Sequence, residues 1–224
     1  MQKIDRLKIR QSLKIIDLAG RKYQPRIGVF WSGGADSMVL LHLVKRAQDD
    51  KISLPVLYID TKSESATTNQ FIEKIKRDWQ LPLLRVSDKP TRRQYRKAKS
   101  KSEKRQLIQM MKIRSIKRAI KKYRLKALMT GIRWQEDEAY ESEVYFSPRK
   151  NHVRIHPLLH FTKEEIMSYL EENAVPYLEE NSLQMRYPQK QGLLQRLLKR
   201  KKSLPKVKAH KGKVSRKMRS LGYF

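Results

Sequence analysis

The segment Ser32-Gly33-Gly34-Ala35-Asp36-Ser37 combines the side chains and the backbone freedom that a phosphate-binding turn requires. Its glycines let the backbone approach an anion closely, and the first N–H groups of a following helix would point at that anion. Two serine hydroxyls are further donors, and the Asp36 carboxylate could place a magnesium ion that bridges phosphates. We therefore predict a pyrophosphate site formed by Ser32, Gly33, Gly34, Asp36 and Ser37, with Asp36 as the metal ligand. The alternative is a glycine turn without a ligand.

The residues around this turn predict a strand before it and a helix after it. Residues 28–31 form a short apolar run, and residues 38–44 are mostly apolar over a helical length. The segment differs from the P-loop of kinases and GTPases, which has a longer glycine spacing and a lysine followed by Ser or Thr. No such lysine follows Gly34.

Strand and helix patterns alternate along most of the chain. Further strands are predicted at 55–59, 81–86, 127–131 and 153–155, and further helices at 4–18, 68–79, 107–123 and 162–173. Such a βαβαβ order predicts the α/β class, with a doubly wound, mostly parallel sheet. Residues 88–105 lack apolar periodicity, so we predict a mobile basic loop there, ahead of a basic helix.

Polar residues follow two of the predicted strands and should join the turn in one site. Doubly wound sheets bind ligands beyond the carboxyl ends of their strands, where the strand order reverses. Asp60 would lie near the nucleoside or the metal, unless it caps a helix instead. Arg133 would stabilise charge on a phosphate, unless it pairs with the acidic residues 136–138. The predicted nucleotide contacts here are Asp60, Thr61, Thr130 and Gly131, with Asp36 and Arg133 as catalytic residues.

These segments together resemble a known superfamily. The turn is similar to the SGGxDS loop of the PP-loop ATP pyrophosphatases. The order of residues 58–61, 130–133 and 155–158 resembles the phosphoadenylylsulfate (PAPS) reductase and ATP sulfurylase small-subunit branch, over residues 25–180. The resemblance implies an adenine nucleotide alpha hydrolase-like fold, cleavage of ATP between its α- and β-phosphates, and ATP and Mg²⁺ as cofactors.

The end of the chain both extends and limits this resemblance. Residues 214–222 are similar to the basic stretch that ends in Arg-Ser/Thr-Leu-Gly in ATP sulfurylases, which implies a second phosphate contact at Arg219. The residue that follows is Tyr223, where the family has cysteine. The chain contains no cysteine, which excludes a thiolate nucleophile, a disulfide and a thiolate metal site within it. Because reductases of this branch depend on a cysteine, we do not expect the chain alone to reduce PAPS.

The formal net charge is +30, and it is concentrated in two windows. Residues 89–126 hold 17 Lys and Arg against one acid, and residues 184–224 hold 14 against none. Such windows predict a polyanion partner, for which we favour nucleic acid, RNA rather than DNA. Few aromatic residues lie among these charges, so base stacking has little support. The candidate phosphate contacts are Arg92, Arg93, Arg96, Lys97, Lys199, Arg200, Lys201 and Lys202.

The length of 224 residues suits one domain with appendages. We predict a nucleotide-binding domain over residues 1–183, with a basic helical insertion at 88–126, and a basic C-terminal extension over residues 184–224. An apolar run long enough to span a membrane and a secretory signal are both missing from the sequence, so a cytoplasmic location is expected.

Three functions remain open at this point. The first is an AMP- and pyrophosphate-forming enzyme that adenylates or modifies RNA, with a sulfur donor or another protein as a partner. The alternative is a sulfate adenylyltransferase resembling the ATP sulfurylase small subunit. The third is a catalytically weak member that binds nucleic acid or a ribonucleoprotein.

Overall fold

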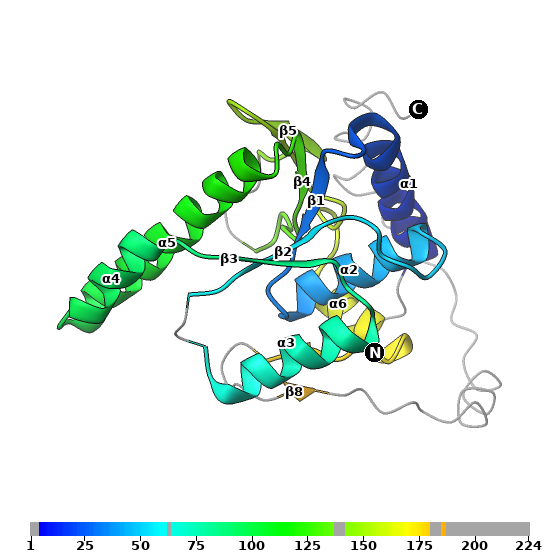
Figure 1. Cartoon of the computed structure of the whole chain (residues 1–224). Coiled ribbons are helices and arrows are strands. Elements are labelled where there is room, and N and C mark those ends of the chain that lie inside the picture. The colour runs from blue at the N-terminus through cyan, green and yellow to red at the C-terminus, as the bar shows by residue number, and fades with distance from the viewer. Residues whose placement is uncertain (1–4, 62–63, 137–141, 180–184, 187–224) are drawn as a thin grey trace. The chain divides into compact units, whose positions relative to one another are not determined.

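A central sheet of six strands organises the chain in the computed structural model, in the order β3-β2-β1-β4-β6-β5 (Figure 1). The structure describes residues 5–61, 64–136, 142–179 and 185–186. The chain divides into a first unit, Met1–Gln189, and a second, Lys190–Phe224. All of the described residues belong to the first unit, and the boundary expected after residue 183 remains a prediction.

Five of the six strands run parallel, which confirms the predicted α/β class and the mostly parallel sheet. The strand β1 (Ile27–Phe30) lies between β2 (Val56–Ile59) and β4 (Ala127–Met129) and is parallel to both. The outer strand β3 (Leu83–Val86) pairs with β2, and β6 (Val153–Ile155) pairs with β4. The chain moves outward from β1 to β3 and then returns to the other side of β1. The strand order therefore reverses between β1 and β4.

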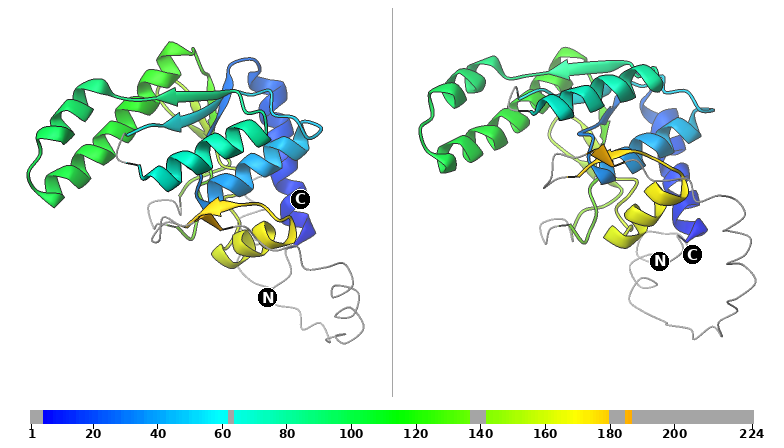
Figure 2. Two further views of the ribbon diagram at one scale, coloured as in Figure 1. Left: turned by 60° about the horizontal axis from the view of Figure 1, so that its bottom comes forward. Right: turned by 90° about the horizontal axis from the view of Figure 1, so that it is seen from below.

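The helices cover both faces of the sheet, as right-handed crossovers require. The helices α2 (Ala35–Ala47) and α3 (Ala66–Asp78) follow β1 and β2 and lie on one face. The helix α5 (Lys101–Lys122) belongs to the returning crossover, and its C-terminal half packs on the other face (Figure 2). Apolar side chains of β2, β3 and β4 meet α5 in the buried cluster of Leu57, Ile59, Val86, Ala119, Leu125 and Leu128.

Two helices complete the unit beside α2. The first, α1 (Arg6–Tyr23), continues past residue 18, the last residue of the predicted helix. The other, α6 (Lys163–Glu172), begins where the sequence predicts, at a capping box in which Thr162 accepts from the Glu165 N–H and Glu165 accepts from the Thr162 N–H. Lys8 of α1 pairs with Glu165 at 2.7 Å, which joins the two helices.

The predicted mobile loop at 88–105 is wrong. Residues Lys89–Lys97 form the helix α4, and α5 begins at Lys101, before the predicted start at residue 107. Asp88 caps α4 by accepting from the Thr91 N–H, and Ser100 caps α5 by accepting from the Glu103 N–H. Apolar periodicity missed these helices because α4 buries only Thr91 among its own residues. The capping residues were the local signal that could have found them.

Three short strands of the structure were not predicted from the sequence. The edge strand β5 (Phe146–Pro148) runs antiparallel to β6. A separate two-stranded sheet pairs β7 (Tyr177–Leu178) with β8 (Met185–Arg186). Each has two or three residues, too few for a recognisable alternation. Within the described part of the chain, every helix is too short or too polar to cross a bilayer.

Candidate nucleotide site

The turn between β1 and α2 is ordered by its own hydrogen bonds. The Ser37 hydroxyl donates to the Gly34 carbonyl at 2.9 Å and accepts from the Ser32 N–H at 3.2 Å. Gly33 has a φ of +87°, a backbone conformation that favours glycine. Gly34 is the N-cap of α2, so the first N–H groups of that helix have no intrahelical acceptor. The arrangement leaves them available to an anion, and the pyrophosphate contact itself remains a prediction.

A residue far along the chain supports this turn from outside. The Leu178 N–H donates to the Gly33 carbonyl at 2.9 Å, and Leu178 forms a parallel bridge with Gly34. A Cβ on Gly33 would lie 2.9 Å from the Leu178 side chain. Leu178 is not among the predicted site residues, because an apolar residue 140 or more positions away carries no local signal of this contact.

Asp36 and Arg133 meet across the β1–β4 switch point. The Arg133 Nε donates to the Asp36 Oδ1, and the Arg133 side chain is buried while Asp36 is partly exposed. Gly131 brings them close, because a Cβ there would lie 3.1–3.3 Å from atoms of Asp36. The two predicted catalytic residues are therefore in direct contact. The alternative partners proposed for Arg133 extend into residues 137–141, which lie outside the described part of the chain.

This ion pair has a clear electrostatic consequence. The Arg133 guanidinium neutralises the Asp36 carboxylate beside the N-terminus of α2. A phosphate would attract the same guanidinium, and a divalent cation the same carboxylate. Among the described residues no group of three or more acidic, His or Cys side chains could hold a metal ion. A magnesium ion here would thus rely on Asp36, nucleotide phosphates and water, which matches how Mg²⁺ is usually held.

A buried histidine orients the threonine at the end of β4. The Thr130 hydroxyl hydrogen-bonds the Nδ1 of His156 at 2.7 Å, and His156 has no exposed surface. Burial, outweighing the nearby Glu143 carboxylate, lowers the pKa of His156 to about 4. The ring is therefore neutral at neutral pH and positions Thr130 without adding charge. His156 was part of the matched segment 155–158, but the sequence did not predict this role.

Asp60 and Thr61 lie at the end of β2, on the other side of β1. Asp60 is buried, and its Oδ2 lies 3.8 Å from an Arg85 guanidinium nitrogen. The Thr61 hydroxyl donates to Glu64 at 2.7 Å. Asp60 does not cap α3, since Ser65 does so by accepting from the Thr68 N–H. The turn, Asp60–Thr61 and Thr130–Gly131 thus share one edge of the sheet, but a nucleoside or metal contact of Asp60 remains a prediction.

The predicted phosphate contacts of the basic windows divide into two groups. Arg92, Arg93, Arg96 and Lys97 belong to α4, where Arg92 is half-buried and the other three are exposed. Arg219 and the group Lys199, Arg200, Lys201 and Lys202 lie outside the described residues. Their roles remain predictions.

The sequence pattern of the phosphoadenosine phosphosulfate reductase domain matches residues 26–180, which include every described site residue. An adenosine 5'-phosphosulfate reductase of Shouchella clausii is 28% identical over 174 residues, which are 74% of this chain and 69% of that protein. The sulfate adenylyltransferase subunit 2 of Pseudoalteromonas translucida is 28% identical over 148 residues, 66% of this chain. This chain spans only 49% of that subunit.

Solved structures show the same fold. A Candida auris phosphoadenylyl-sulfate reductase in a phosphate complex has a TM-score of 0.59 and 18% identity, with 79% of this chain and 90% of that chain covered. The Candida glabrata FMN adenylyltransferase in complex with ATP has a TM-score of 0.58 and 23% identity. That match covers 76% of this chain and 56% of the adenylyltransferase. The fold is therefore adenine nucleotide alpha hydrolase-like, as the resemblance implied.

Proposed function

Since this chain belongs to the phosphoadenosine phosphosulfate reductase domain family, we propose that it binds ATP at the Ser32–Ser37 turn and transfers the adenylyl group to an acceptor. One observation carries the proposal. The open N-terminus of α2 lies beside the contact between Asp36 and Arg133, at the point where the strand order reverses. Free N–H donors, a guanidinium and a carboxylate that could bind a metal ion thus lie close together, which supports the proposal.

The proposed reaction divides the triphosphate between these groups. An acceptor oxygen forms a bond to the α-phosphorus, and the bond from that phosphorus to the α–β bridging oxygen breaks. Pyrophosphate leaves with the electron pair. The N–H groups at the start of α2 bind the β- and γ-phosphates, and Arg133 stabilises the negative charge that grows on the α-phosphate. A magnesium ion at Asp36 would, when bound, neutralise part of the phosphate charge.

The preferred acceptor in this proposal is sulfate or a similar oxyanion. The two named relatives are sulfur-metabolism enzymes, one an adenosine 5'-phosphosulfate reductase and the other a sulfate adenylyltransferase subunit, and neither is named for action on RNA. These names support the sulfate adenylyltransferase alternative better than the first expectation of an RNA substrate. The chain contains no cysteine, so it offers no thiol for a reductase step of its own.

A nucleic acid is the second candidate acceptor, because of one specific feature. The basic helices α4 and α5 follow β3 in the chain, and β3 ends at the same edge of the sheet as the turn. A polyanion bound there would lie near the nucleotide site.

Pyrophosphate release tests the proposal. The full chain is incubated with ATP and Mg²⁺, alone or with sulfate, molybdate or single-stranded RNA, and pyrophosphate and AMP are measured. We expect sulfate or molybdate to stimulate release, and stimulation by RNA alone would favour the second acceptor. Asp36→Ala should abolish release, while the control Asp17→Ala, on the exposed face of α1, should not change it. Unchanged release in Asp36→Ala would refute the assignment of the site.

A further inference from the structure

The helices α4 and α5 form an antiparallel hairpin, here called the arm, which extends beyond the sheet in both Figures 1 and 2. Seventeen Lys and Arg residues and one acid lie between residues 89 and 126. Among the described residues of the arm, only Arg118 has an ion pair with a carboxylate, that of Asp88. Nearly all of the arm's positive charge is therefore available to a partner.

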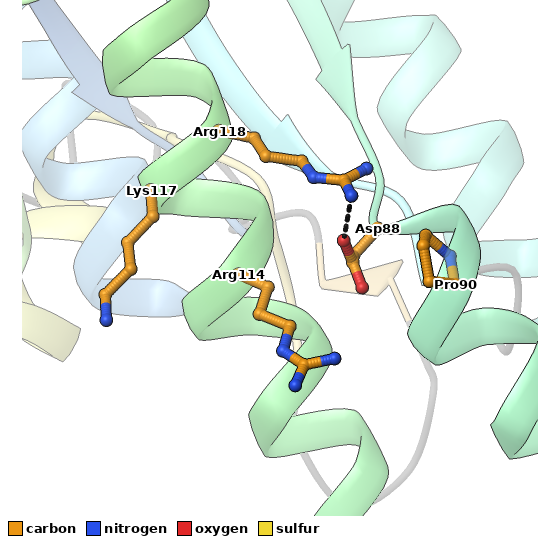
Figure 3. A pocket seen from close by; sticks show the side chains of 5 residues that line it. All are labelled: Asp88, Pro90, Arg114, Lys117 and Arg118. Carbon is orange, nitrogen blue, oxygen red and sulfur yellow. Dashed lines mark ion pairs between the residues drawn. The ribbon is translucent and has the colours of Figure 1, made fainter.

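We propose that the arm binds the phosphate backbone of a nucleic acid, with a pocket at its base that holds one phosphate group. The pocket has a volume of about 290 Å³ and lies between the start of α4 and the C-terminal half of α5 (Figure 3). It is lined by Asp88, Pro90, Arg114, Lys117 and Arg118. This inference concerns binding and does not depend on which acceptor the nucleotide site uses.

The carboxylate in the pocket is occupied by protein groups. Asp88 is buried, and its Oδ2 accepts from the Thr91 N–H at 3.0 Å and from the Thr91 hydroxyl. Its Oδ1 lies 3.1 Å from a guanidinium nitrogen of Arg118. Burial acts to raise the pKa of Asp88, but the Thr91 hydrogen bonds and the Arg118 and Arg114 charges lower it on balance. Asp88 is therefore ionised at neutral pH, and it orients Arg118 instead of repelling an incoming anion.

Two cations of the pocket form no ion pair among the described residues. Arg114 donates to the Thr91 hydroxyl at 3.0 Å and acts on the Asp88 carboxylate only from a distance. Lys117 has no ion pair in that part of the chain, and it extends away from Asp88 in Figure 3. Positions 114, 117 and 118 share one face of α5, because they are three and four residues apart. Guanidinium groups match phosphate oxygens in geometry as well as in charge.

The distribution of charge around α5 favours a nucleic acid over a membrane surface. Lys112 and Lys117 are both exposed, and five residues on a helix correspond to a rotation of about 140°. A flat anionic surface would contact one of these sides only. A nucleic-acid strand carries a charge about every 3.4 Å and can follow a curved surface, so it can contact both.

The base of the arm lies at the same edge of the sheet as the nucleotide site, so a strand bound to the arm could reach that site. Asp88 comes two residues after the end of β3, and the parallel register aligns Val86 of β3 with Ile59 of β2. The pocket and the Ser32–Ser37 turn therefore belong to the same edge of the sheet. Only β2 separates β3 from β1, which corresponds to about 10 Å between strand axes.

Binding of a labelled oligonucleotide tests the inference. Fluorescence anisotropy is measured with the full chain and a 5'-labelled single-stranded RNA over a series of NaCl concentrations. The double variant Arg114→Gln/Lys117→Gln should bind about tenfold more weakly at moderate salt, and the slope of log K against log salt should fall by about 1.4, from two lost phosphate contacts. The matched control Lys51→Gln/Lys150→Gln removes two exposed charges before β2 and β6, at the opposite edge. It should bind within about twofold of the unaltered chain.

Several outcomes would overturn the inference. These are equal affinities and slopes for the two double variants, no RNA or DNA binding by the unaltered chain at low salt, or binding to phosphatidylserine vesicles but not to oligonucleotides. Parallel titrations with single-stranded DNA and duplexes separate the kinds of nucleic acid, and tighter binding of any one supports the inference. If circular dichroism shows that the arm variant is unfolded, Lys117→Gln alone replaces it.

One further variant separates this inference from the proposed function. Asp36→Ala should lose pyrophosphate release and retain RNA binding. Loss of release in Asp36→Ala, together with normal RNA binding in every arm variant, would support the nucleotide site and reject the arm. If the unaltered chain cleaves no ATP but binds RNA through the arm, the arm is supported and the proposed function is rejected.

Discussion

The contact between Arg133 and Asp36 is the residue-level feature on which the nucleotide site depends. Both residues were identified in the sequence, 97 positions apart, but only the folded chain joins them. In the proposed reaction the guanidinium exchanges its carboxylate partner for a phosphate. Its contribution would then be electrostatic and would be expressed in the transition state.

Arg133→Gln should therefore lower pyrophosphate release by about 100-fold, a typical loss for one charge-stabilising donor. Arg133→Lys should recover part of this loss, because it restores the charge without the planar fork. The measurement is the rate at saturating ATP, with thermal unfolding as a check on folding. A rate for Arg133→Gln within about twofold of the unaltered chain would show that Arg133 only fixes Asp36.

Gly33 and Gly34 are adjacent, but only the backbone conformation at Gly33 favours glycine. Gly33→Ala places a side chain at a φ of +87°, which should lower the free energy of unfolding by about 1–2 kcal/mol. Gly34 has a φ of −70°, and a Cβ there would meet only the Ser32 hydroxyl oxygen at 3.6 Å. Gly34→Ala should therefore change stability by less than Gly33→Ala. Urea unfolding measures both, and equal losses would contradict the assigned backbone geometry.

His156 should make stability depend on pH. Its pKa is lowered from 6.5 to about 4 by burial, so the unfolded chain binds a proton at a pH where the folded chain does not. The stability contributed by the neutral ring is complete above about pH 6.5 and is lost as the pH falls toward 4, by about 3 kcal/mol. His42 and His160, whose pKa values burial also lowers to about 4, act in the same direction.

His156→Asn should consequently flatten the decline in unfolding free energy between pH 6.5 and pH 4. Chemical denaturation at intervals over this range provides the comparison. An equally steep decline in the variant would mean that His156 is not a buried neutral ring.

At the level of elements, the helix α4 was wrongly predicted as a mobile loop, and its composition explains why. Its residues are mostly polar and only Thr91 is buried, so it has no apolar stripe to recognise. The helix is defined instead by its N-cap, Asp88, and by its packing against α5. Its stability therefore depends on a few contacts at its base.

Asp88→Ala should lower the free energy of unfolding by about 2–3 kcal/mol, because the cap of α4 and the buried hydrogen bonds from Thr91 are lost together. The control Asp17→Ala removes an exposed carboxylate that pairs with Arg21 within α1, and should cost about 0.5 kcal/mol or less. Urea unfolding by circular dichroism compares them. Equal costs would mean that Asp88 does not organise the arm.

At the level of the whole molecule, the net charge of +30 should oppose folding through repulsion between like charges. Added salt screens this repulsion, so the thermal midpoint should rise as NaCl is increased at constant pH. Differential scanning fluorimetry from low to physiological ionic strength measures the effect. A midpoint that falls over this range would indicate that attractive ion pairs dominate the electrostatics of the folded chain.

The local features of this protein could be predicted from its residues alone. The strand–turn–helix around Ser32–Ser37, the parallel α/β sheet and the positions of Asp60, Thr130 and Arg133 at strand ends all follow from apolar periods and turn residues within short segments. Such features were predictable because their physical causes act between near neighbours in the chain.

The contacts between distant segments became known from the folded chain and could not be predicted. The Arg133–Asp36 ion pair, the Leu178 contact with Gly33, the Thr130–His156 hydrogen bond and the pocket of the arm each join segments that are separated by many residues. Their geometry depends on strand order, register and the burial of side chains against other elements. A single sequence carries no local pattern that specifies such contacts, because packing across the whole sheet sets them.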